Sequence, residues 1–498
     1  MNVNPITRLD YPDPDVIRVE DTYYMVSTTM HFMPGCEILQ SFDLVHWEHV
    51  TYVYETLDHT DAQQLKSGQN IYGQGMWAAS LRYHEGRFYI CFVANDTRKT
   101  YLYTSEKIDG PWKKQLIEGF YHDGSLLFDE DGRNYIVYGN DEIWITELNE
   151  DLTAPKKDGL HRLLVSDHKN PELGYEGSHI QKINGYYYIF LVHSLRDRWM
   201  RTEACFYSDS LEGEFTGGDV LCDDRGYCGQ GVAQGGIVDT PDGKWYAMLF
   251  QDSGAVGRIP ILLPVTWKDH FPFFGQNGHV PEEIEVHSTR PGYIYQPLVG
   301  SDDFCNGLLP RWQFNHDPDP RYYHLDALQG TYTITTREVC TELTQAVNTL
   351  TQRMSYPSCA AEVTVDASAL KEGDVAGLCA LQSCYAAVGI TKHHGKYEVL
   401  MLDKKEDGIL DMTEGTVVES HQMDFRLEAD FCNMKDEARC YYRVNKGDWL
   451  PIGTVHKLYF KLDHFTGCRF GLFCYAAEEI GGSACFRDFK YYDVDEIS

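Results

Sequence analysis

The feature that most constrains the fold is a segment that recurs five times in the first half of the chain. Each copy begins with small or acidic residues, runs as a short strand, turns tightly and returns as an aromatic-rich strand. The copies start 45 to 65 residues apart and comprise residues 13–24, 78–89, 123–135, 176–188 and 234–246. Self-similarity at this spacing is typical of a repeat architecture.

The turns inside the copies support the same interpretation. They fall at Glu20-Asp21, Glu85-Gly86, Asp131-Gly132, Asn184-Gly185 and Asp242-Gly243. Four of the five end in glycine, which tolerates the positive φ that tight hairpins need. Repeats of this length, with about four strands each, are what a β-propeller requires. We therefore predict a five-bladed β-propeller over residues 1–295.

The remaining residues, 296–498, lack the repeat, and we interpret them as a second all-β domain. Residues 271–275 through 290–292 are rich in proline and glycine and are interpreted as a linker. Strand-like runs follow at 332–335, 360–366, 397–402 and 458–462. A β-sandwich is the expected fold for such residues. No long amphipathic helix is expected anywhere.

Charge and cysteine usage limit the partners and the compartment. The net charge of −32 repels nucleic acid and acidic membranes but not a neutral sugar. The 15 cysteines are scattered without a Cys-x-x-Cys pair, so zinc is not indicated. The N-terminus resembles no signal peptide, and no run is long enough to cross a membrane. We expect a cytoplasmic protein, with homo-oligomerisation left open.

Three acids share one position of the repeat. In our alignment that column holds Asp13, Ala78, Asp123, Glu176 and Gln234. Because the inner strands of a propeller surround its axis, these residues would ring one mouth of the channel. Clustered acids would serve either a hard cation such as calcium or glycoside hydrolysis, which pairs a base or nucleophile with a protonated acid. Asp123 would then help to keep Glu176 protonated by like-charge repulsion.

Several motifs together resemble glycoside hydrolase family 43. They are Tyr11-Pro-Asp-Pro-Asp15 with Arg18, Phe32-Met-Pro-Gly35, Trp77-Ala78, Tyr175-Glu-Gly-Ser178 and Val256-Gly-Arg258. The resemblance covers the whole chain, since Asp302-Asp-Phe304 and Trp312-Gln-Phe-Asn-His316 are similar to the start of the β-sandwich appended to β-xylosidases of this family.

The resemblance implies an inverting, exo-acting enzyme that needs no cofactor and releases xylose, with arabinose as a further product, from short oligosaccharides. Asp13 matches the general base, Glu176 the general acid and Asp123 the residue that tunes and orients the acid. Inversion requires the base and acid carboxyls to lie about 6.5–9.5 Å apart. Arg258 matches a contact to substrate hydroxyls, and Trp77 and Phe32 would wall the pocket.

Gln234 is expected to bind substrate together with Trp77, Arg258 and Phe32. It is a departure, because some family members carry a histidine there that supports a bound cation. A structural calcium ion on the axis is therefore left without a clear ligand set. His179 is interpreted as a satisfied core histidine. The rivals are an α-L-arabinofuranosidase without xylosidase activity, a retaining sucrose- or fructan-acting propeller, and a carbohydrate-binding propeller without catalysis. The sandwich is a binding module, a lid or an oligomer contact.

Overall fold

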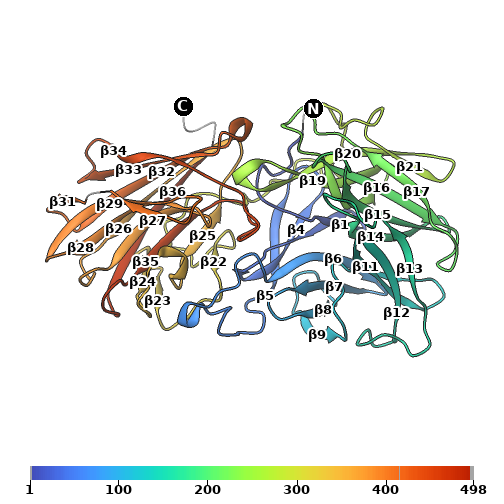
Figure 1. Cartoon of the computed structure of the whole chain (residues 1–498), viewed down its shortest axis with the longest axis horizontal. Coiled ribbons are helices and arrows are strands. Elements are labelled where there is room, and N and C mark those ends of the chain that lie inside the picture. The colour runs from blue at the N-terminus through green and yellow to red at the C-terminus, as the bar shows by residue number, and fades with distance from the viewer. Residues whose placement is uncertain (1–2, 414, 494–498) are drawn as a thin grey trace.

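The computed structural model describes residues 3–413 and 415–493. Its regular secondary structure is almost wholly β-strand, arranged as two units that lie side by side (Figure 1). Within those residues the only helices are four three-residue 3₁₀ turns. None of the helices there is long or apolar enough to span a bilayer.

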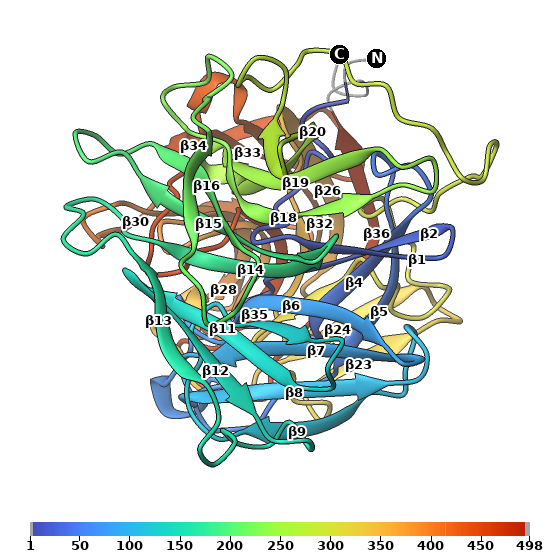
Figure 2. The ribbon, with the colours of Figure 1, turned by 90° about the vertical axis from the view of Figure 1, so that its right-hand side faces the viewer.

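The N-terminal unit is a five-bladed propeller of four-stranded antiparallel sheets set around an axis (Figure 2). Blade one contains β1 (Asp15–Val19), β2 (Thr22–Ser27), β4 (Gly35–Ser41) and β5 (Glu48–Tyr54). Blade two contains β6 (Met76–His84), β7 (Arg87–Ala94), β8 (Lys99–Ser105) and β9 (Lys113–Ile117). Blade three contains β10 (Ser125–Phe128), β11 (Asn134–Asn140), β12 (Glu142–Leu148) and β13 (His161–Ser166).

Blade four contains β14 (Glu176–Ile183), β15 (Tyr186–Ser194), β16 (Arg201–Ser208) and β17 (Thr216–Leu221). Blade five contains β18 (Ala233–Asp239), β19 (Trp245–Asp252), β20 (Arg258–Lys268) and β21 (Phe271–Phe274). The five predicted turns join the first two strands of each blade. The predicted propeller is confirmed, down to the number of blades.

One boundary of the predicted linker is wrong. Phe271–Phe274 is the outer strand of blade five and pairs antiparallel with β20. Its aromatic side chains alternate, with Phe274 buried against the blade and Phe273 exposed. Pro272 obscured the strand in the sequence, although proline is tolerated on a strand at the edge of a sheet.

The ends of the propeller ring meet beside β20. The backbone N–H of Ile6 donates to the carbonyl of Pro260 (2.8 Å), and that of Tyr11 donates to the carbonyl of Arg258 (3.0 Å). The segment that leads into β1 is therefore fastened to blade five. This closure brings Asp13, in blade one, next to Arg258, in blade five.

The C-terminal unit is a β-sandwich of two antiparallel sheets, as predicted. One sheet has the order β3 (Phe32–Met33), β22 (Gln313–Asn315), β25 (Leu350–Arg353), β35 (Arg469–Tyr475), β27 (Val375–Leu381), β28 (Ala386–His393), β29 (Lys396–Lys404) and β30 (Leu410–Met412), and β31 (Thr416–Val418) also pairs with β29. The other has the order β23 (Tyr323–Asp326), β24 (Thr331–Thr335), β36 (Ser483–Asp493), β26 (Ser358–Asp366), β32 (Gln422–Asp430), β33 (Glu437–Val444) and β34 (Leu450–Lys457).

Three of the four strand-like runs in this half fall on β24, β26 and β29. The fourth prediction, a strand at 458–462, is wrong. After β34 the chain leaves the sheet, and Leu462 is 76% exposed. The apolar residues there belong to a loop that crosses from the sandwich to the propeller.

The two units share a sheet and a buried ion pair. β3, from the loop of blade one, pairs with β22 of the sandwich. Glu37 on β4 forms an ion pair with Arg353 on β25 at 2.8 Å, and both side chains are buried. Removing only one partner of such a buried pair strongly destabilises a protein, because the other charge is left buried without compensation. The interface therefore fixes the two units against each other.

Candidate active site

Asp13 lies at the mouth of the propeller channel and is held from two sides. The hydroxyl of Thr28, just after β2, donates to Asp13 Oδ2 at 2.6 Å. The guanidinium of Arg258, at the start of β20, contacts Asp13 Oδ1 through Nη1 at 3.2 Å. Thr28 in turn accepts the backbone N–H of Ala78 at 2.9 Å. The carboxylate is buried, and its two oxygens have fixed and different partners.

Asp123 and Glu176 meet across one imidazole. His122 Nε2 lies 3.6 Å from Asp123 Oδ2 and 3.6 Å from Glu176 Oε2. The backbone N–H of Gly177 donates to Asp123 Oδ2 at 2.9 Å. The side-chain amide of Asn140, at the end of β11, donates to Glu176 Oε2 at 2.7 Å. The structure thus brings two of the three predicted acids to one imidazole, whose Nε2 lies beyond hydrogen-bond distance of both.

The charges of this cluster perturb one another. Burial raises the pKa of Asp123 to about 6, with Glu176 and Asp13 adding to the rise and His122 opposing it. The carboxylate of Asp123 raises the pKa of His122 to about 9, against the opposing effect of burial. His122 is therefore a cation at neutral pH that partly balances the acids around it. That Asp123 keeps Glu176 protonated stays a prediction.

The predicted acid column needs a correction in blade four. The residues that share a left-handed backbone at the start of the inner strand are Asp13 (φ 53°), Ala78 (25°), Asp123 (49°), Gly177 (65°) and Gln234 (64°). Glu176 precedes this position. It pairs with β15 as Trp77 pairs with β7 and Ala233 with β19, and a bulge follows in all three blades.

The alignment failed because Asp123-Gly-Ser and Glu176-Gly-Ser match by residue type. By backbone conformation, however, the residue of blade four that is equivalent to Asp123 is Gly177. A Cβ on Gly177 would lie 2.7 Å from Gln234 Cγ, so glycine is needed for space as well as for its positive φ. Glu176 reaches the cluster from the neighbouring position, the one that His122 occupies in blade three. Gln234 itself is buried at the mouth, and its backbone N–H donates to Glu203 at 2.7 Å.

Trp77 lies beside the acids, with its ring centroid 6.1 Å from that of His122, and it meets a residue from the second domain. Phe465, on the loop between β34 and β35, lies with its ring centroid 5.4 Å from that of Trp77. Its ring is 4.2 Å from the guanidinium carbon of Arg258. The Trp77 indole N–H is buried without a protein partner, which leaves a donor for a hydroxyl group. Of the roles left open for the sandwich, these contacts favour the lid.

Phe32 does not wall the pocket, contrary to our expectation. It is 2% exposed within β3, at the interface of the two units. The guanidinium of Arg469 covers its ring at 3.4 Å, and His31 packs on it at 4.3 Å between ring centroids. With its ring packed in this way, Phe32 has no face free for a sugar. Its role is to join the domains.

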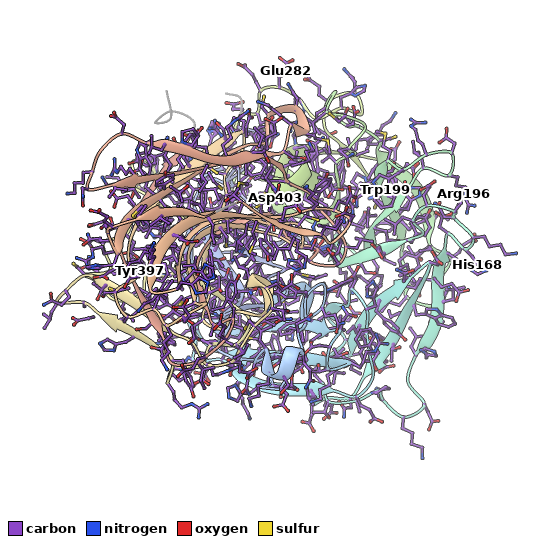
Figure 3. All side chains as sticks on the ribbon, turned by 60° about the vertical axis from the view of Figure 1, so that its left-hand side comes forward. His168, Arg196, Trp199, Glu282, Tyr397 and Asp403 are labelled. Atoms are coloured by element: carbon purple, nitrogen blue, oxygen red, sulfur yellow. The ribbon has the colours of Figure 1, made fainter. Side chains whose placement is uncertain are left out.

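A further aromatic side chain lies on the loop between β15 and β16 of blade four. Trp199 is 43% exposed, and the guanidinium of the buried Arg201 lies 5.1 Å from its ring. Arg196, on the same loop, donates to the carbonyl of His168 at 3.3 Å. Figure 3 shows Trp199 nearer to the sandwich than Arg196 and His168 in that view. The loop thus presents an indole on the blade that carries Glu176.

Deeper along the axis, Asp15 forms a closed polar cluster. It accepts bonds from Arg82 Nη1 (2.8 Å) and from the backbone N–H of Leu81 (2.7 Å), and His179 Nδ1 lies 3.1 Å away. Although burial acts to raise it, these partners hold the pKa of Asp15 at about 2. The interpretation of His179 as a satisfied core histidine agrees with this arrangement.

Among the described residues, one group has the spacing of metal ligands. The ligand atoms of His122, Asp123 and Glu176 all lie within 4.8 Å of one another. Calcium prefers six to eight oxygen ligands, and these three residues offer two carboxylate oxygens and one ring nitrogen. No step of the chemistry below depends on a metal.

Sequence reasoning missed four residues of this site: Thr28, His122, Asn140 and Phe465. His122 directly precedes Asp123 and was available as a signal. The other three lie outside the repeated segment, Asn140 at the end of β11 and Thr28 and Phe465 on loops. Phe465 is 452 residues from Asp13 along the chain, and only the docking of the domains brings it to the mouth.

The propeller with carboxylates at its axial mouth is the architecture of a glycoside-cleaving enzyme, and the comparisons agree. The model for "Glycosyl hydrolases family 43" matches residues 3–272. That for the "Beta xylosidase C-terminal Concanavalin A-like domain" matches residues 301–492. The chain therefore belongs to glycosyl hydrolase family 43.

Relatives of known name resemble the whole chain. A "Beta-xylosidase" of Formosa agariphila is 26% identical and is matched over 99% of this chain and 89% of its own length. The structure of a "Bifunctional GH43-CE" protein of Bacteroides eggerthii is 42% identical with a TM-score of 0.92. It is matched over 98% of this chain, which spans 63% of that protein's length.

A GH43 enzyme engineered to display "both endo-xylanase and exo-arabinofuranosidase activity" is 27% identical with a TM-score of 0.86. It is matched over 99% of both chains. This match spans the propeller and the sandwich together, so the pairing of the two domains is shared with a solved structure.

Proposed function

We propose that the protein is an exo-acting, inverting glycosidase that releases xylose from the ends of short β-linked xylo-oligosaccharides. The observation that carries the proposal is the division of the mouth into two carboxyl environments. Asp13 is bonded to Arg258 and Thr28, whereas Glu176 is bonded to Asn140 and lies beside His122 and Asp123. Inversion requires two such groups with separate tasks.

In the proposed reaction, a water molecule attacks the anomeric carbon while Asp13 accepts one of its protons. The glycosidic C–O bond breaks, and Glu176 gives its proton to the departing oxygen. Asn140 and the His122 cation both face Glu176 Oε2. They stabilise the carboxylate left after proton transfer and leave Oε1 as the oxygen that carries the proton. Exchange with solvent then returns both carboxyls to their starting states.

The substrate class follows from the wall and from the relatives. Trp77 and Phe465 narrow the mouth on one side, which favours a chain end over the middle of a polymer. The Formosa agariphila relative is named a β-xylosidase. A second candidate is α-L-arabinofuranosidase activity, alone or beside the first, which is favoured by the exo-arabinofuranosidase activity described for the engineered GH43 enzyme.

A panel of aryl glycosides tests the proposal: β-xyloside, α-L-arabinofuranoside, β-galactoside and β-glucoside. We expect the fastest turnover on the xyloside. Asp13→Asn and Glu176→Gln should each lose at least about 10²–10⁴-fold on an unactivated xylo-oligosaccharide. Saturable sugar binding without product release would instead support the non-catalytic propeller.

We also propose that the protein works in the cytoplasm. All fifteen cysteines are unpaired, and most of them are buried. Reduced thiols are typical of that compartment, because oxidising compartments favour disulfides. Cell fractionation of the source organism, with antibody detection, tests this location; recovery outside the cytoplasm would contradict it.

A further inference from the structure

Asp10 is a buried carboxylate at the junction of three segments. It is 5% exposed and precedes β1 by five residues. Its Oδ1 accepts the backbone N–H of Arg258 at 2.7 Å, and its Oδ2 accepts the backbone N–H of Gly467 at 2.7 Å. Arg258 contacts Asp13, and Gly467 follows Phe465 by two residues. One side chain therefore holds both the start of β20, which carries Arg258, and the loop that carries Phe465.

The two backbones approach this carboxylate through glycines. A Cβ on Gly257 would lie 2.3 Å from Asp10 Oδ1, and Gly257 has a φ of +108°. A Cβ on Gly467 would lie 2.7 Å from Asp10 Cβ and 2.2 Å from the carbonyl oxygen of Val256. Heavy atoms do not approach so closely, so larger residues would push either segment away from Asp10.

The loop that Asp10 holds makes the contacts that complete the site. The carbonyl of Phe465 accepts a bond from Arg258 Nη2 at 3.3 Å, and its ring lies over the same guanidinium. The preceding residue, His464, stacks on Tyr72 of the propeller with ring centroids 3.9 Å apart and an interplanar angle of 2°. Because the loop starts and ends in the sandwich, these ties and the bond from the backbone N–H of Cys468 to the carbonyl of Ala255 (2.8 Å) fix Phe465 relative to Asp13.

We propose that Asp10 is a positioning residue that sets Arg258 and the Phe465 loop over the general base together. Asp10 makes no contact with Asp13, Asp123 or Glu176 among the hydrogen bonds of the described residues, and it acts through Arg258 and Phe465. A carboxylate suits this task because both of its oxygens accept hydrogen bonds. An asparagine would turn its own N–H groups toward one of the two backbone donors. The effect on turnover rests on the proposed function.

The test compares Asp10→Asn with Asp302→Asn. Asp302, in the sandwich, is also 5% exposed. One of its oxygens accepts the N–H of Phe304 (2.7 Å) and the other accepts the indole N–H of Trp312 (2.8 Å). Both variants thus lose one buried acceptor, but only Asp10→Asn releases the loop. Hydrogen exchange of residues 459–467 and steady-state kinetics on the aryl β-xyloside are measured for the full-length protein.

We expect faster exchange in residues 459–467 for Asp10→Asn alone. We also expect a loss in kcat/KM of about 10- to 100-fold, since a small displacement of a positioning group has effects of that size. The double variant Asp10→Asn/Phe465→Ala should lose less kcat/KM than the product of the losses measured for the two single variants. Loop exchange and kcat/KM equal to those of Asp302→Asn would overturn the proposal.

A second variant keeps the test decisive if Asp10→Asn does not fold. Gly467→Ala displaces the loop by the close contacts above while it leaves the charge of Asp10 in place, and it should reproduce the faster exchange and the kinetic loss. Wild-type values of kcat and KM for Gly467→Ala would count against the proposed positioning role of Asp10. If the wild-type enzyme turns over no glycoside of the panel, the proposed function fails, while the exchange data still decide whether Asp10 holds the loop.

Discussion

The charge on His122 offers a prediction whose size follows from the structure. His122 lies 3.6 Å from two carboxylates, and its pKa is raised from 6.5 to about 9, chiefly by Asp123. A group whose pKa is raised on folding stabilises the native state fully below its unfolded pKa. That contribution is lost as the pH rises through the folded value. The relevant window is therefore pH 6.5 to 9.

The expected magnitude is about 3 kcal/mol, since each pKa unit corresponds to roughly 1.4 kcal/mol. His122→Gln keeps a polar side chain of similar size but cannot titrate. Between pH 6.5 and 9.5, the wild-type free energy of unfolding should fall by about 3 kcal/mol more than that of His122→Gln. Comparing the two proteins removes the titration of the shared groups that His122 does not perturb; the pKa of Asp123, which His122 lowers, changes with the substitution.

Urea unfolding followed by tryptophan fluorescence measures this difference. Seven of the nine tryptophans lie within residues 1–295, so the signal reports chiefly on the propeller. If the pH dependence of the wild type and of His122→Gln runs parallel over this window, His122 is not held as a cation by Asp123 and Glu176, and the electrostatic description of the site is wrong.

Three other variants test separate parts of the account. Asp123→Asn removes the main cause of the raised pKa of His122 and a like charge beside Glu176, so the alkaline limb of kcat/KM should move to lower pH; an unmoved limb would refute this role. Burial lowers the pKa of His464 from 6.5 to about 3, so its neutral form stabilises the fold above pH 6.5 and that stability is lost on acidification. Between pH 7 and pH 5, the free energy of unfolding of His464→Phe should therefore fall by about 2 kcal/mol less than that of the wild type, as measured by urea unfolding. Equal decreases in the two proteins would contradict this. Trp199→Ala should raise KM about three- to tenfold for xylo-oligosaccharides, but not for methyl β-xyloside, whose leaving group has no ring to stack on the indole; equal effects on both substrates would argue against stacking.

The propeller was predictable because its signals are local and repeated. Turn residues such as Asn184-Gly185 fix hairpins between neighbouring residues, and five copies of one pattern leave few other architectures. The strand Phe271–Phe274 was missed because its proline resembles a linker, although its aromatic alternation marks an edge strand.

The site was predictable only where its residues lie in the repeat. Asp13, Asp123 and Trp77 reach the mouth from the expected places, whereas the register of Glu176 is displaced by one residue. A bulge at the start of an inner strand changes which residue faces the axis, and residue type alone does not reveal it.

Contacts between the domains were beyond sequence patterns. Phe32 and Phe465 are both aromatic residues on loops, and their positions depend on how the sandwich docks. That docking buries Phe32 under Arg469 and places Phe465 beside Trp77. Neither outcome leaves a local signal in the chain.

The most direct test of the account is the anomeric form of the sugar first released from a β-linked xylo-oligosaccharide, followed by proton NMR before mutarotation. The account assigns Asp13 to activate water and Glu176 to protonate the leaving oxygen, so α-xylose should appear first. β-Xylose as the first product would show retention, and it would contradict the assignment of Asp13 as a general base.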